Sequence, residues 1–368
     1  MTVQLIYAPT DTHLWAESYD RSPNDTVTLP QDAARSIAAV THSALAGSTP
    51  QKYINPAAHD AYLHGRYLWF TTNELASGQY FLKATQIQPD YALAWVGLST
   101  YYGAGMVDGD LDPRTDIPRM KDAALKSIQL DDSLAESHWA MSASRWIADW
   151  DFNAALQELD RAIQLDPKLT EAHHLRGKIL GQLNRHDEAL AEQRIAMEIN
   201  PFERPWSLAY FLLRARRFDA AIADAKQRLE GDPDLSTWYI LSEAYSGKGM
   251  DKEAEYALEQ AFRLCGECNG QPTADALHRA FAHGGKQEVL LLLLNKTKSQ
   301  KDYVSPYSLA SLYSQLGDKL QALAWLDECL RQHAPPILDI QNDTAFDSLH
   351  ADPHYRAIVE KVGLPPAY

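Results

Sequence analysis

The spacing of apolar and proline positions is the most regular property of this chain. From about Asn55 onward, alanine-rich segments with helical apolar spacing end at prolines: Pro89, Pro167, Pro201 and Pro233. Pro167 and Pro201 lie 34 residues apart, which is the period of a two-helix repeat. Because proline ends one helix and directs the chain into the next, the pattern predicts an all-α array of stacked helix pairs.

Large and small residues occupy fixed positions within these units. Large side chains recur on the first helix of a pair, as Trp95, Leu98 and Tyr102 do, and alanines recur on the second helix. In these positions the segments resemble tetratricopeptide repeats. The resemblance implies a right-handed superhelical array of about eight helix-turn-helix units over residues 55–334. We expect residues 335–368 to cap the apolar end of the last unit.

Residues 1–50 follow a different pattern. Two short runs with β-type composition, residues 3–7 and 13–19, flank a turn, which predicts a β-hairpin, and residues 31–46 are predicted as a helix. The phrase at residues 10–21, Thr-Asp-Thr-His-Leu-Trp-Ala-Glu-Ser-Tyr-Asp-Arg, resembles the end of the TolB-like domain that precedes helical repeats in bacterial regulators. The resemblance implies that residues 1–50 are the C-terminal remnant of such a domain. In such relatives an upstream winged-helix or kinase domain is the effector, and neither is present in this sequence.

The inner surface of the predicted array is where we expect a partner to bind. The first helix of each pair lines the concave side of such superhelices, and aligning the units by their core positions identifies its side chains. The predicted groove residues are Tyr62, Arg66, Trp69, Trp139, Trp146, His174, Lys178, Trp206, Tyr210, Tyr239, Glu243 and Tyr307. Tyr and Trp combine a large contact area with a polar atom, which suits recognition of a peptide. The alternative is that half of these residues pack against neighbouring helices.

The net charge of −15 narrows the class of partner. Nucleic acids and anionic membrane surfaces would be repelled, so neither is expected as a ligand. The longest apolar run, residues 289–294, is too short to span a bilayer, and residues 1–4 do not resemble a signal peptide. We therefore expect a cytoplasmic protein, with the periplasm as the alternative if an anchored domain lies upstream.

Few residues offer catalytic or metal chemistry. The sequence contains no Gly-rich phosphate loop, no His-Glu-x-x-His helix and no Gly-x-Ser-x-Gly elbow. Cys265 and Cys268 form a C-x-x-C pair, which favours two loop cysteines that pair in an oxidising compartment over half a zinc site or a redox centre. His173 and His174 point about 100° apart on a helix, so they do not easily share one ion. We expect polar contacts there instead.

The second unit has about nine residues more than the usual turn of such a repeat. This insert, between Gly103 and Pro113, is rich in Gly and Asp. It lacks the ordered Asp-x-Asp-x-Asp-Gly positions and the terminal Glu of a calcium loop. We therefore expect a flexible loop at the edge of the array and no calcium site.

These features favour a non-enzymatic module that binds a protein or peptide in its groove, as the scaffold or sensor part of a bacterial regulator. No catalytic residue, metal or cofactor is expected. Two alternatives stay open. One is a metal- or redox-active protein that uses Cys265 and Cys268. The other is an assembly factor that oligomerises through the hairpin between Val3 and Tyr19, because unpaired strand edges recruit partners.

Overall fold

The computed structural model describes residues 2–7, 12–18, 53–70, 74–201, 207–231, 233–265, 270–300 and 303–366. The helix predicted at residues 31–46 lies outside the described residues, as do Trp206 and Cys268. The chain divides into two compact units, Met1–Leu98 and Ser99–Tyr368. The division falls within α4 (Ala92–Val107). The domain boundaries predicted at residues 50, 55 and 335 stay predictions.

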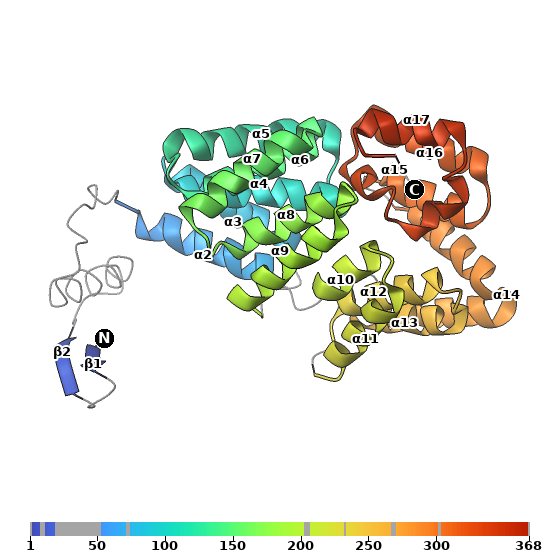
Figure 1. Cartoon of the computed structure of the whole chain (residues 1–368), viewed down its shortest axis with the longest axis horizontal. Coiled ribbons are helices and arrows are strands. Elements are labelled where there is room, and N and C mark those ends of the chain that lie inside the picture. The colour runs from blue at the N-terminus through green and yellow to red at the C-terminus, as the bar shows by residue number, and fades with distance from the viewer. Residues whose placement is uncertain are drawn as a thin grey trace. The chain divides into compact units, whose positions relative to one another are not determined.

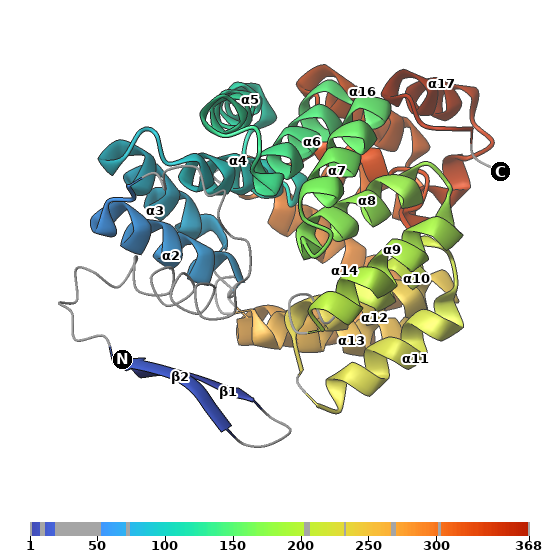
Figure 2. The ribbon, with the colours of Figure 1, turned by 60° about the vertical axis from the view of Figure 1, so that its left-hand side comes forward.

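The first unit begins with the predicted β-hairpin. Strands β1 (Thr2–Tyr7) and β2 (Thr12–Ser18) pair antiparallel, and the ladder has a register shift between Leu5 and Ile6. Figure 2 shows the two strands lying side by side. The β-type composition of these runs and the turn between them therefore identified the strands correctly.

One phenylalanine explains the glycines of the first unit. Helices α2 (Pro56–Phe70) and α3 (Glu74–Ile87) form a pair, and Phe81 is 1% exposed. A Cβ atom on Gly65 would stand 2.7 Å from the Phe81 ring, and one on Gly97 would stand 2.4 Å from it. Both glycines are therefore needed because the ring occupies the space that any larger side chain would take.

The second unit is a succession of helix pairs (Figure 1). Its helices after α4 are α5 (Pro113–Leu130), α6 (Ala135–Asp149), α7 (Phe152–Leu165), α8 (Thr170–Gln182), α9 (His186–Ile199), α10 (Ser207–Arg214), α11 (Phe218–Leu229), α12 (Leu235–Gly247), α13 (Asp251–Leu264), α14 (Gly270–Lys298), α15 (Pro306–Gln315) and α16 (Lys319–Gln332). Non-helical backbone at Gly284 and Gly285 divides α14 into two helices. The predicted helical repeat array is confirmed.

Aspartates determine where several of these helices begin. The carboxylate of Asp151 accepts a hydrogen bond from the backbone amide of Ala154 at 2.9 Å, and Asp234 accepts one from Thr237 at 2.8 Å. The first amides of a helix have no acceptor within the helix, so each of these caps satisfies one of them.

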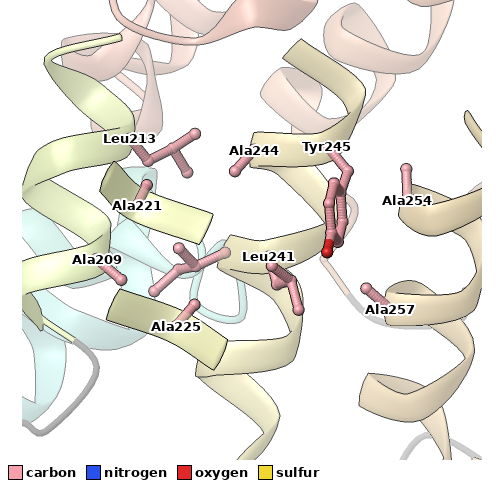
Figure 3. Packing of buried hydrophobic residues seen from close by; sticks show 10 residues of the cluster. Ala209, Leu213, Ala221, Ala225, Leu241, Ala244, Tyr245, Ala254 and Ala257 are labelled. Carbon is pink, nitrogen blue, oxygen red and sulfur yellow. The ribbon is translucent and has the colours of Figure 1, made fainter. Parts of the chain in front are cut away.

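Small side chains set the distance between the helices of α10 to α13 (Figure 3). Ala221, Ala225 and Ala244 are fully buried, which lets the helix backbones approach closely. Tyr245 is 7% exposed and fills the space towards Ala254. The predicted alternation of small and large core positions is confirmed at this contact.

The insert between Gly103 and Pro113 consists of the last helical turn of α4 and a hydrogen-bonded turn after it. Helix α4 continues to Val107, and the side chain of Met106 is fully buried. The amides of Asp110 and Leu111 both donate to the carbonyl of Gly105, at 2.8 and 2.9 Å. The prediction of a flexible loop is wrong, because these contacts hold the backbone of the insert.

The C-terminal segment follows α16. It consists of the 3-10 helices η2 (Pro335–Asp339) and η3 (Thr344–Leu349) and of α17 (Pro353–Val362). These elements pack on α15 and α16, and they bury Phe346 and Tyr355 completely. The segment therefore shares a core with the last helix pair.

The C-terminal segment also reaches earlier helices of the second unit. The Asn342 side-chain amide donates to the carbonyl of Gly181 at 3.0 Å, in a buried position at the end of α8. The His333 ring stacks on Trp150 after α6, with ring centroids 3.8 Å apart and planes at 14°. The end of the second unit thus lies against its α6 and α8 helices, so the array closes on itself (Figures 1 and 2).

Candidate functional site

A cavity of about 410 Å³ lies on the inner side of the second unit. The ends of α4, α6, α8, α10 and α12 line it from one side, and α14, α15, η2 and Asp343 line it from the other. Its charged lining residues are Asp108, Lys178, Arg214, Glu243, Asp339 and Asp343. Cavities of this size enclose small ligands or a few side chains of a partner.

Part of the predicted groove lines this cavity. Trp146, Lys178, Glu243 and Tyr307 are lining residues. The hydroxyl of Tyr210 lies close to them, because it donates to a carboxylate oxygen of Asp339. The first helices of four separate pairs therefore contribute the side chains that the repeat alignment placed on the concave side.

Other predicted groove residues of the second unit serve packing. Trp139 is 9% exposed, and Tyr239 lies edge-on against Phe262 in a core cluster. The His174 ring pairs with Gln193 at 3.0 Å. For Trp139 and Tyr239, the alternative of packing against neighbouring helices describes their surroundings better than an open groove.

Three predicted groove residues belong to the first unit. Tyr62 is 7% exposed and packs between Phe81 and Tyr91, while Arg66 and Trp69 are half-buried. These residues form no part of the cavity lining. Their role in binding stays a prediction.

The C-terminal segment uses the polar atoms of the groove aromatics. The indole N–H of Trp146 donates to Gln182 at 2.7 Å, and the Gln182 amide donates to Asp339 at 2.7 Å. The Tyr307 hydroxyl donates to Asp343 at 2.9 Å. Since both aspartates come from the C-terminal segment, that segment forms part of the cavity lining. Neither Gln182 nor the two aspartates were among the residues predicted to line this cavity.

Arg214 is the central cation of the cavity wall. Its guanidinium lies 3.0 Å from Glu243 and 5.1 Å from the centre of the Tyr210 ring, and its side chain is 16% exposed. Burial alone would lower the pKa of Arg214, but Glu243, Tyr210 and Asp339 outweigh it and raise the pKa. Nε of Arg214 is buried and has no hydrogen-bond partner among the described residues. The arginine is therefore held by charge and by ring stacking.

Carboxylates outnumber cations around the cavity. Its lining holds four carboxylates, the side chains of Asp108, Glu243, Asp339 and Asp343, and two cations, those of Lys178 and Arg214. The Glu243 side chain is 46% exposed, and the protein around the rest of it partly buries the carboxylate. That burial, opposed by Arg214 and reinforced by Asp343 and Asp339, raises the pKa of Glu243. The electrostatics of the site thus favour an added positive charge.

Asp108 gives a measurable sign of this surplus. Burial raises its pKa to about 6, although Lys178 acts in the opposite direction. The folded protein therefore binds a proton more tightly than the unfolded chain, and stability falls as pH rises from about 4 to about 6.

Replacing Asp108 with asparagine is expected to raise the free energy of unfolding by about 1 kcal/mol above pH 6. The gain is small because the side chain is exposed to cavity water. Urea unfolding above about pH 6 and below about pH 4 measures this gain. Below about pH 4 the variant and the parent protein should unfold alike. An equal gain at both pH values would contradict the electrostatic explanation.

The remaining candidate sites proposed from the sequence are occupied by structural contacts. The His173 ring pairs with Glu192 at 2.7 Å and is 6% exposed. The polar contact expected there is therefore present. Cys265 ends α13 and is disulfide-bonded. Cys329 is a buried free thiol, as expected for a core residue.

Comparison with known proteins agrees with this helix-pair architecture. A family model described as tetratricopeptide repeat matches residues 170–203 and 307–332. The chain contains tetratricopeptide repeats. The matched segments contain α8 with α9 and α15 with α16, so Lys178 and Tyr307 of the cavity lie in recognised repeats.

Several solved structures resemble the chain. The crystal structure of YrrB, described as a TPR protein with an unusual peptide-binding site, is 16% identical with a TM-score of 0.33, and the match covers 53% of this chain and 97% of YrrB. A crystal structure of MamA is 19% identical with a TM-score of 0.26, covering 54% of this chain and 92% of MamA. The TPR domain of P58(IPK) is 13% identical with a TM-score of 0.26, covering 83% and 92% of the two chains. No curated protein matches the chain.

The helices were also compared with the requirements of a membrane span. Within the described part of the chain, no helix is both long enough and apolar enough to cross a bilayer.

Proposed function

We propose that this chain is a protein–protein interaction module that binds a basic segment of a partner in the cavity of its second unit. The surplus of carboxylates in the lining of this open cavity is the observation that carries the proposal. A lysine or arginine side chain placed there would approach Asp108 and Glu243, both of which gain from an added positive charge. Tetratricopeptide and related helical repeats use such concave surfaces for binding.

The aromatic part of the wall supports a peptide rather than a free cation. Trp146 and Tyr307 provide flat surfaces for the aliphatic part of a long basic side chain. Hydroxyl groups of Ser308 and Ser311 are available along α15 for backbone groups of a bound segment. A cationic side chain within a peptide therefore matches both kinds of surface.

The biological setting of this binding is a further part of the proposal. We propose that the module is the scaffold or sensor part of a bacterial regulator, on the resemblance of residues 10–21 to the end of TolB-like domains. Partner binding in the second unit would then be the input. An effector elsewhere in the regulator would supply the output.

Titration with short labelled peptides tests the binding proposal. A peptide containing lysine and arginine is expected to bind the purified full chain, and its match with glutamate in place of the basic residues is not. Asp108→Asn and Glu243→Gln should each weaken the basic peptide about fivefold or more, as fluorescence anisotropy measures, because each removes a cavity charge.

Glu198→Gln is the matched control, since Glu198 is an exposed carboxylate outside the cavity lining. It should leave affinity unchanged. Raising the salt concentration should weaken the basic peptide, because screening reduces charge attraction. Equal binding of the basic and acidic peptides, or equal affinity in all three variants, would rule out the cavity as the site.

A further inference from the structure

Two buried carboxylates lie one turn apart on α13. The side chains of Glu255 and Glu259 are 10% and 6% exposed. Charged carboxylates are rarely buried unless a cation compensates them, because removal from water costs free energy. The surroundings of this pair therefore decide what it can bind.

An imidazole from the next helix completes the group. Nδ1 of His278, on α14, lies 3.7 Å from Oε1 of Glu255 and 3.4 Å from Oε1 of Glu259. The potential ligand atoms of the three residues all lie within 4.8 Å of one another. The His278 side chain is 67% exposed, so the group is open to solvent on that side.

The two carboxylates differ in their support. Oε1 of Glu259 accepts a long hydrogen bond from Arg263 at 3.4 Å, and Arg263 also faces Asp275 at 3.8 Å. Oε1 of Glu255 is buried and has no hydrogen-bond partner in the part of the chain that the structure describes. An unpartnered oxygen that faces a second carboxylate and an imidazole is an available metal ligand.

We propose that Glu255, Glu259 and His278 bind a divalent transition-metal ion of the Zn²⁺ class. In tetrahedral coordination, metal–ligand distances of about 2.0–2.2 Å place neighbouring ligand atoms about 3.4 Å apart. The separations of 3.4 and 3.7 Å from His278 to the two carboxylates are close to that value, and the carboxylate oxygens lie within 4.8 Å of each other. Water would complete the coordination on the exposed side.

The mixed ligand set identifies the class of metal. Calcium and magnesium prefer oxygen ligands alone, whereas an imidazole nitrogen with carboxylates suits zinc and related ions. The surrounding charges agree with a divalent ion, since Glu259 and Asp275 pair with one arginine, Arg263, and Glu255 pairs with His278 alone among the ion pairs of the described residues. Arg263 would also orient Glu259, as hydrogen-bonded neighbours of metal ligands do.

This site is separate from the peptide cavity. The cavity lining includes none of the three proposed ligands. A failure of either proposal therefore leaves the other standing. No local spacing indicates the site, because its third ligand comes from another helix, 19 positions after Glu259.

Titration of the chelator-treated full chain with Co²⁺ tests the proposal. Co²⁺ bound in a tetrahedral site absorbs visible light strongly, and Zn²⁺ should displace it and remove the absorption. We expect saturation at about one equivalent, the number of ions that one three-ligand site holds. His278→Ala and Glu255→Gln should each weaken binding at least tenfold.

His283→Ala is the matched control, because His283 is an exposed histidine on the same helix. It should bind Co²⁺ as the parent chain does, and metal-free melting curves verify that every variant is folded. The proposal is overturned if no saturable absorption appears. It is also overturned if the His278 and Glu255 variants bind like the parent, which would place the ion elsewhere.

Discussion

Replacing Arg214 with methionine is expected to lower the free energy of unfolding of the second unit by about 1–3 kcal/mol at pH 7, because Arg214 is buried whereas solvent partly screens its 46% exposed partner Glu243. Methionine keeps much of the side-chain volume, so the loss reports the charge. Arg214 pairs with Glu243 at 3.0 Å, and the negative charges of Glu243 and Asp339 raise the pKa of Arg214. Without the arginine, these enclosed carboxylates face one another with only Lys178 nearby in the cavity lining.

The penalty should depend on pH in a defined direction. Burial already raises the pKa of Glu243 above its ordinary value, and Arg214 opposes that shift. Loss of the arginine raises the pKa further, so the folded variant takes up protons more readily than the unfolded chain. Stability then falls as pH rises through the interval between the two values, and the deficit should shrink as pH is lowered from 7 towards about 5.

Urea unfolding at pH 7 and pH 5 measures both effects. Arg217→Met is the control, because Arg217 pairs with Asp187 on the surface, where the two side chains are 46% and 88% exposed. Its loss should cost less than about 1 kcal/mol at either pH. A similar cost for both arginines would show that the cavity wall does not depend on its central cation.

Replacing Phe346 with alanine is expected to cost about 3–5 kcal/mol. Phe346 is fully buried in the C-terminal segment, and its ring lies edge-on to Tyr307 with centroids 5.3 Å apart. Removal of the ring leaves a cavity between that segment and α15. The same loss should loosen Asp343, which accepts the hydrogen bond of Tyr307.

Chemical denaturation followed by circular dichroism and by tryptophan fluorescence measures this change. Fluorescence is informative because Trp150 stacks on His333 just before the segment. Leu320→Ala is the control, since Leu320 is 82% exposed and its loss should change stability by less than about 0.5 kcal/mol. If Phe346→Ala unfolds at the same urea concentration as the control, the C-terminal segment contributes little to the core.

Local patterns predicted the helix pairs because their contacts are local in sequence. The two helices of a pair need small residues at one face and a large residue at the next, and Ala221, Ala225 and Tyr245 follow that rule. Gly65 lets the helices of its pair approach closely, and the ring of Phe81 lies against it. Each inference used residues within one or two neighbouring helix pairs.

The closure of the second unit was not predicted, because its contacts carry no periodic signal. Gln182 and Asp339 are 157 positions apart, and neither residue type is unusual at its position. The repeat alignment placed Trp146 and Lys178 on the concave side, but it could not show that Asp339 would meet them there. Such pairing depends on the summed rotation of all the intervening helices, and local patterns in a single sequence do not reveal that sum.

Trp139 shows the limit of the alignment at one residue. Its position on a first helix predicted an inward-facing side chain, yet it is only 9% exposed. Alignment of the repeats predicts the direction in which a side chain points. It does not predict whether a neighbouring helix covers that side chain.

An open array of helix pairs should extend gradually under tension, because each pair contacts only its neighbours. In the second unit, α8 is tied to the C-terminal segment by the Gln182–Asp339 and Gly181–Asn342 hydrogen bonds. A force that pulls residue 99 away from residue 366 must break this tie before the helix pairs between α8 and α16 can separate. The unit should therefore resist extension until these hydrogen bonds break, and it should then lengthen abruptly.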